Sequence, residues 1–312
     1  MDFTFSTCSN NDKNSSVAFV EGGDYDKEII YMNEGNYDDN SIDSDTAEIA
    51  NNIISKIKGR MSFKKLNLLH EAIQNNKRPL NQELAQYYDT CMQSITKSKN
   101  KEIILKSGEL FPCFDENNLK RQVMYVAGPS GSGKSYYSAK LCKTYHKQFP
   151  DNNIILFSNK LEDPVFDRLA YINRIVIDNS LLEDKMTLNE LKDSLIIFDD
   201  IECSILKDIN TELDRIRDLI LLQGRSYKTS FIYISHQLTN YKQTRNILNE
   251  AHQITLFPRL TTKYNLKYLL EKYFGFDKAE ITKVCNLPSR WITINKAPSF
   301  VMYQRGIYLT NC

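Results

Sequence analysis

Apolar and polar positions follow two different periods along the chain. Short runs that are apolar almost throughout recur in its second half, at 122–127, 153–158, 174–178, 194–200 and 230–235. Such runs are typical of strands buried on both faces of a sheet. Between them, apolar residues at steps of three and four predict helices over 134–148 and 208–223. This alternation predicts an α/β fold with a mostly parallel central sheet flanked by helices.

The last sixty residues continue the same pattern. Residues 252–257 predict a further strand, and 265–274 predict a helix. The segment 290–310 predicts two terminal strands around the turn at 297–299, which would form a C-terminal β-hairpin.

The first hundred residues have a different character. Helical spacing at 49–73 and 82–95, interrupted by a polar break around Pro79, predicts a small helical appendage over 49–100. Residues 1–50 hold 12 acids against 2 bases, whereas 51–312 hold 27 acids against 38 bases. An acidic, Asn- and Ser-rich opening buries little apolar surface, so we expect 1–48 to be a flexible acidic arm. The α/β domain would then span 101–312.

Composition narrows the class of protein. No apolar stretch reaches membrane-spanning length, and the acidic amino terminus resembles no targeting signal. The seven cysteines are scattered without a C-x-x-C pair, which favours a reducing compartment over a disulfide framework. We therefore expect an intracellular, unsecreted protein. The basic body fits either a polyanionic partner or a solvated lysine-rich surface.

The string "GPSGSGKS" at 128–135 fits the phosphate-loop pattern G-x-x-x-x-G-K-[ST]. It lies between a predicted strand and a predicted helix, as the chemistry requires. Glycines at 128, 131 and 133 let the backbone adopt positive φ and turn its N–H groups toward phosphate oxygens, while the helix directs its positive end at the same anion. The predicted ATP-binding residues are Gly128, Pro129, Ser130, Gly131, Ser132, Gly133, Lys134, Ser135 and Tyr136.

Within that loop, Lys134 is expected to contact the β- and γ-phosphates, and the Ser135 hydroxyl to bind Mg²⁺. A second motif supplies carboxylates: four apolar residues run into Asp199 and Asp200 at the carboxyl end of a predicted strand. There, Asp199 would hold Mg²⁺ and Asp200 would act as the catalytic base. Alone, the same string is also typical of a strand that runs into a turn.

The strand at 230–235 ends in Ser235, His236 and Gln237. If it lies between the loop strand and the acidic strand, Ser235 or Gln237 can sense the γ-phosphate; otherwise these are polar residues that end a strand. We interpret His236 as a structural histidine. Of the arginines before this strand, Arg225 is the candidate to reach a neighbouring subunit's γ-phosphate, and a cation complementing a helix end is the alternative.

The three motifs "GPSGSGKS", "LIIFDD" and "GRSYKTSFIYISHQ", in that order, resemble the FtsK-HerA superfamily, and specifically the poxvirus-type genome-packaging ATPases of large DNA viruses. The similarity covers about residues 105–310 and includes the tail "LPSRWITINKAPSFVMYQRGIYL". It implies a homo-oligomeric ATPase ring that threads double-stranded DNA, in the viral factory of the host cytoplasm or in the virion, with capsid or virion-assembly proteins as partners.

By residue match, the resemblance makes Lys134 and Ser135 the phosphate-loop pair, Asp199 the Mg²⁺ ligand and Gln237 the sensor. Many members carry glutamate as the base where this chain has Asp200. Cations that can line a DNA path without reading bases, or simply solubilise the surface, are Lys160, Lys228, Lys242 and Arg245.

Two other functions are compatible with the sequence. One is a P-loop switch or scaffold that binds nucleotide and regulates virion assembly without moving DNA. The other is a small-molecule kinase, which would want an arginine-rich lid that the sequence does not display.

Overall fold

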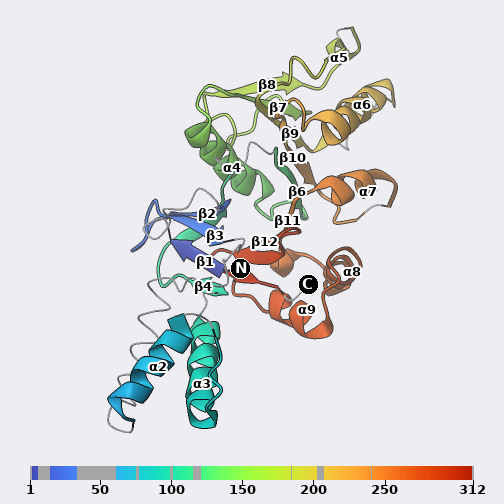
Figure 1. Cartoon of the computed structure of the whole chain (residues 1–312). Helices are drawn as coiled ribbons and strands as arrows, with labels where there is room; N and C mark the ends of the chain where they lie inside the picture. Colours follow the sequence, from blue (N-terminus) through green and yellow to red (C-terminus); the bar gives the residue numbers. More distant parts are fainter. Residues whose placement is uncertain are drawn as a thin grey trace. The chain divides into compact units, whose positions relative to one another are not determined.

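The protein is described here by a computed structural model (Figure 1). The structure describes residues 2–5, 15–33, 61–74, 77–98, 101–114, 121–183, 185–201, 207–239 and 241–310. Two compact units are present. One consists of Met1–Thr4 and Met32–Lys101, and the other of Phe5–Tyr31 and Glu102–Cys312.

The first unit contains two helices, α2 (Phe63–Gln74) and α3 (Gln82–Ser98), which pack against each other, and most of strand β1 (Asp2–Phe5). The shared core of the helices consists of Leu69, Ile73, Leu84, Tyr88 and Cys91. Both helices lie where helical spacing predicts them, although the start of the first predicted helix, 49–60, lies outside the described residues.

A ten-stranded sheet forms the second unit, in the order β4-β14-β13-β12-β11-β6-β10-β9-β7-β8. Six neighbouring strands are parallel: β11 (Gln253–Leu256), β6 (Val123–Ala127), β10 (Ser230–Ser235), β9 (Ser194–Asp199), β7 (Asn153–Ser158) and β8 (Ile172–Val176). The apolar residues of β6, β7, β9, β10 and β11 are buried on both faces, as the unbroken apolar runs predict, whereas those of the outermost strand β8 are only partly buried.

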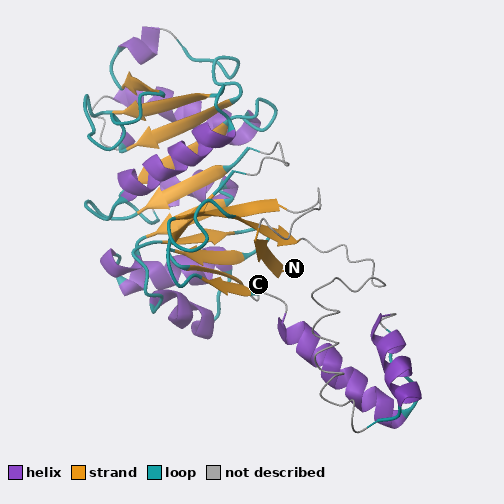
Figure 2. Cartoon of the chain, turned by 90° about the vertical axis from the view of Figure 1, so that its left-hand side faces the viewer, coloured by secondary structure: helices purple, strands orange, loops and turns teal. Residues whose placement is uncertain are grey.

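Helices cover both faces of these strands (Figures 1 and 2). On one face, α4 (Lys134–Gln148) contacts β6, β9 and β10. Residues of α6 (Lys207–Gln223), α7 (Tyr241–Glu250), α8 (Lys263–Phe274) and α9 (Lys278–Cys285) share one core with alternate strand residues such as Tyr125, Phe198 and Phe231. Two short helices, α5 (Ser180–Glu183) and η3 (Pro258–Leu260), complete the set described. The predicted fold class is confirmed.

An antiparallel extension is larger than the sequence predicts. Instead of one terminal hairpin, β12 (Ile292–Asn295), β13 (Phe300–Tyr303) and β14 (Gly306–Leu309) form a three-stranded meander, which β4 (Glu102–Ile104) extends. The two-strand prediction is wrong because the chain turns again at Gln304 and Arg305. Gly306 allows this turn, since a Cβ on it would lie 2.3 Å from the Tyr303 hydroxyl.

Part of the predicted flexible arm is ordered, which corrects that prediction for residues 15–33. There, β2 (Ser15–Glu21) and β3 (Ile29–Asn33) join β5 (Glu109–Pro112) in a second sheet, in the order β3-β2-β5. Phe19 stacks on Phe111, with ring centroids 5.8 Å apart, and Glu21 pairs with Lys140 of α4. The apolar stretches "SVAFV" and "IIYM" provide buried side chains for these strands, although the average composition of the segment is acidic. Residues 34–48 lie outside the described residues.

Within the described parts of the chain, no helix combines the length and the apolarity that crossing a bilayer requires. Among the described cysteines, Cys91, Cys142 and Cys285 are free thiols.

Candidate nucleotide-binding site

The strand order brings the predicted motifs to one edge of the sheet. Strand β10 lies between β6 and β9, and its register pairs Ser235 with Ala127 and Ile234 with Asp199. Because all three strands are parallel, their carboxyl ends meet at the same edge. The phosphate loop after β6, the acidic pair at the end of β9 and the polar tip of β10 are therefore neighbours, as the sensor interpretation requires.

The phosphate loop uses its glycines in two different ways. Gly131 and Gly133 have φ of 73° and 103°, the left-handed region that favours glycine. Gly128 does not, which corrects the expectation of positive φ at all three. Glycine is required at position 128 for a steric reason, because a Cβ there would lie 2.8 Å from the Phe257 ring and 2.9 Å from Ser132 Oγ.

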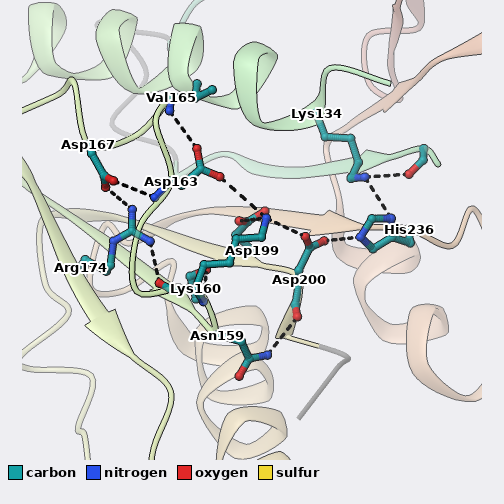
Figure 3. A network of polar contacts seen from close by, with 12 residues as sticks. Lys134, Asn159, Lys160, Asp163, Val165, Asp167, Arg174, Asp199, Asp200 and His236 are labelled. Carbon is teal, nitrogen blue, oxygen red and sulfur yellow. Dashed lines mark hydrogen bonds and ion pairs between the residues drawn. The ribbon is translucent and has the colours of Figure 1, made fainter. Parts of the chain in front are cut away.

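Lys134 begins α4 with its side chain buried. Its ammonium donates to the Gly128 carbonyl at 2.9 Å and to the Pro129 carbonyl at 3.3 Å, and it also lies 3.2 Å from His236 Nδ1 (Figure 3). An ammonium only donates hydrogen bonds, so Nδ1 must accept. The neutral His236 ring then carries its proton on Nε2.

The Nε2 atom of this ring lies beside Asp200. The distance from His236 Nε2 to Asp200 Oδ1 is 2.8 Å, and Lys160 Nζ lies 3.0 Å from the other carboxylate oxygen of Asp200 (Figure 3). Asp200 has φ of 53°, an unusual backbone conformation for a residue other than glycine. A continuous polar chain therefore links Lys134 through His236 and Asp200 to Lys160.

Asp199 is the buried member of the acidic pair, with a side chain 1% exposed. Burial, together with the neighbouring charge of Asp200, raises its pKa above the ordinary aspartate value, and Lys160 at 3.5 Å offsets part of this shift. Its Oδ1 atom is buried without a hydrogen-bond partner among the described residues. A carboxylate oxygen in this state fits Mg²⁺, which prefers oxygen ligands, and Ser135 lies half-buried in the first turn of α4.

The structure places Lys160 beside the acidic pair, with its side chain 44% exposed. Besides both aspartates, its ammonium lies 3.8 Å from Asp163. Burial alone would lower the pKa of Lys160, but the charges of these three carboxylates outweigh it and raise the pKa. Arg174 holds the segment in place by donating to the Lys160 carbonyl at 2.8 Å.

Ser235 and Gln237 are the two candidate γ-phosphate sensors at the end of β10. The side chain of Gln237 is exposed, and its backbone N–H donates to Ser235 Oγ at 2.9 Å. The sensor role of Gln237 stays a prediction. Sequence reasoning missed the linking position of His236, because a histidine after a strand carries no signal of its partners. Only the β6-β10-β9 order puts it between the lysine and the acidic pair.

Arg225 lies at the opposite edge of the sheet. It is exposed in the turn between α6 and the amino end of β10, beside a pocket of about 330 Å³ lined by Arg121, Arg225, Glu250 and His252. A six-residue strand is about 20 Å long, so Arg225 is too distant to contact the phosphate loop of its own subunit. Arg215 and Arg217 form ion pairs with acids of α6.

The remaining predicted residues are dispersed. Ser130 and Tyr136 are exposed on the loop and the first turn of α4, and Lys228 is exposed in the same turn as Arg225. Arg245 is exposed within α7, while the side chain of Lys242 lies outside those described.

Replacing His236 by alanine is expected to lower the turnover of nucleotide about 10-fold while leaving nucleotide affinity near the wild-type value, because Asp200 loses the imidazole that packs beside its carboxylate. His236→Gln is the matched variant, since an amide can still accept at one end and donate at the other. Single-turnover hydrolysis and equilibrium binding measure the two effects. Equal turnover in all three proteins would remove His236 from the site's chemistry.

No family model matches the chain. Among solved structures, it is similar to the genome packaging NTPase B204 from Sulfolobus turreted icosahedral virus 2 in complex with AMPPCP, at 15% identity and a TM-score of 0.42 over 60% of this chain and 97% of B204. The cytoplasmic domain of the type VII secretion ATPase EccC of Thermomonospora curvata is 13% identical, with a TM-score of 0.43 over 68% of this chain and 29% of that one. The pCW3 conjugation coupling protein TcpA is 12% identical, with a TM-score of 0.40 over 94% of this chain and 77% of TcpA.

TM-scores this low carry no functional inference. A sequence relative is more informative: uncharacterized protein V3 of Sputnik virophage is 38% identical over 213 residues, which make up 67% of this chain and 84% of V3. Identity at this level over most of the relative's length shows common descent. The chain therefore belongs to the family of the Sputnik virophage protein V3.

Proposed function

We propose that this protein is a Mg²⁺-dependent ATPase that moves double-stranded DNA and packages a viral genome. The ATPase part of the proposal rests on one observation. Because the strand order is β6-β10-β9, Lys134, Asp199 and Asp200 lie at the same edge of the sheet. A phosphate cradle and an acidic pair at adjacent strand ends are the parts that phosphoanhydride hydrolysis needs.

In the proposed reaction, the loop N–H groups and Lys134 bind the triphosphate. Asp199 and Ser135 would hold Mg²⁺, which neutralises phosphate charge when bound. Asp200 accepts the proton of the attacking water, and His236 holds that carboxylate in place from Nε2. Lys134 must exchange a contact with a carbonyl or with His236 for a phosphate oxygen, so nucleotide binding and the position of Asp200 are coupled.

The motor part rests on other support. The motif order resembles FtsK-HerA packaging ATPases, the relative V3 is viral, and residues 51–312 carry an excess of bases. In a homo-oligomeric ring, Arg225 would act on the γ-phosphate of a neighbouring subunit, which fits its distance from its own loop. DNA would bind without base specificity, and the protein would work with capsid or assembly proteins in the viral factory or the virion.

One observation favours a second candidate, a slow nucleotide switch that regulates assembly. Lys160 already contacts both Asp199 and Asp200, and Lys134 is held by loop carbonyls and by His236. Both lysines would have to give up such contacts when a phosphate or Mg²⁺ binds, which slows turnover.

Duplex DNA is expected to raise ATP turnover several-fold if the protein is a motor. DNA binding through phosphate contacts is salt-sensitive, so the stimulation should fall steeply between about 50 and 200 mM salt. The measurement is phosphate release against DNA concentration, with the native mass determined on the same sample. Equal rates with and without DNA at low salt would exclude the motor and leave the switch.

A further inference from the structure

An arginine that no motif assigns lies beside the phosphate loop. Arg290 follows α9 and precedes β12, more than 150 residues after the loop in sequence. A Cβ built on Gly133 would lie 3.6 Å from its Nε, Cζ and Nη2 atoms. Gly133 caps the amino end of α4, so the guanidinium sits next to the positive end of that helix.

The backbone at Arg290 is held by Gln304, and the residue after it packs on α4. The Arg290 N–H donates to Gln304 Oε1 at 2.7 Å, and Gln304 N–H donates to the buried Ser289 Oγ at 3.1 Å. Trp291 is buried against Tyr137 of α4, with ring centroids 4.9 Å apart. The position of Arg290 beside the loop is therefore part of the packed structure, although its side chain is exposed.

No carboxylate among the described residues forms an ion pair with the Arg290 guanidinium. Within the described part of the chain, the arginines in ion pairs are Arg78, Arg121, Arg174, Arg215 and Arg217. Two like charges, a helix amino end and an arginine, repel each other unless an anion joins them. A second feature of the loop also lacks a partner: the Oγ of Ser132, fully buried, makes no hydrogen bond to a described residue.

We propose that Arg290 binds the phosphate chain of the nucleotide held by the loop of its own subunit, an inference that rests on the proposed nucleotide-binding function. Arginine presents several donors in a planar fork that suits phosphate. Arg290 acts in cis at the carboxyl edge of the sheet, and it is distinct from Arg225, which lies at the amino edge. The antiparallel extension thereby becomes part of the nucleotide site.

Competition binding with ATP, ADP and adenosine against a fluorescent ATP analogue tests this proposal. Arg290→Ala should weaken ATP binding about 10-fold, weaken ADP binding less and leave adenosine unchanged, because a charge-assisted contact to phosphate is lost. Arg290→Lys should be intermediate. Arg305→Ala, which removes another exposed arginine of the terminal strands, is the matched control and should bind as the wild type.

The outcomes separate the two levels of inference. If Lys134→Ala weakens ATP binding and Arg290→Ala does not, the role of Arg290 is overturned and the nucleotide site stands. An equal loss for adenosine would also overturn it, since the contact would then be with the nucleoside. If the wild type binds no ATP, both the nucleotide site and the role of Arg290 are overturned. An unchanged melting temperature of Arg290→Ala shows that the effect is on binding and not on folding.

Discussion

Replacing Lys134 by alanine is expected to reduce ATP hydrolysis about 10³-fold, the size of effect that follows loss of a preorganised charge at a developing anion. Lys134 is the one loop residue whose side chain carries a charge, and it is buried at the start of α4. Steady-state phosphate release and equilibrium ATP binding, measured on the same protein, separate weaker binding from slower chemistry.

Lys143→Ala is the matched control, because Lys143 is an exposed lysine on the same helix. It should hydrolyse ATP at the wild-type rate. Lys134→Ala also removes the contacts of Lys134 with His236 Nδ1 and with two loop carbonyls, so its melting temperature must be compared with that of the wild type. A folded Lys134→Ala protein that retains full hydrolysis would mean that the loop is not the phosphate site.

Asp200→Asn is expected to lower kcat by about 10² to 10⁴, the usual contribution of a positioned general base, with little change in ATP affinity. Asparagine keeps the shape of the side chain and an acceptor for His236 Nε2 but cannot take a proton from water. Asp199→Asn should behave differently, because this change removes a Mg²⁺ ligand. It should raise the Mg²⁺ concentration needed for half-maximal activity.

Activity measured against Mg²⁺ concentration distinguishes the two aspartates. Asp151→Asn, at an exposed site before β7, is the neutral control. If Asp200→Asn retained the wild-type kcat, another residue would be the catalytic base. The reason would be that the aspartate side chain is shorter than the glutamate that many FtsK-HerA members carry at this position. If excess Mg²⁺ restored Asp200→Asn and not Asp199→Asn, the two roles would be exchanged.

Much of the site could be predicted from local signals. The loop, the acidic pair and the tip of β10 each have a recognisable pattern within about ten residues. The partners of these residues could not be predicted in this way. His236 follows β10 and Lys160 follows β7, and neither residue type, by itself, indicates a contact with an aspartate on a neighbouring strand.

The errors have a similar cause. The acidic average of residues 1–48 concealed two apolar stretches that form β2 and β3, since a composition signal weighs the segment as a whole. At the other end, Gly306 permits a second tight turn after Tyr303, and so one expected hairpin became three strands. In both regions the deciding factor was the presence of a partner strand elsewhere in the chain.

By itself, the sequence determined the α/β class, the phosphate loop and the acidic pair, because apolar periodicity and motif spacing are local properties of the chain. The tertiary structure alone decided which polar residues meet. Strand order put His236 between Lys134 and Asp200, directed Lys160 to the acidic pair, separated Arg225 from the loop and brought Arg290 to it. These contacts join residues far apart in sequence, and they depend on which strands pair, which no single segment encodes.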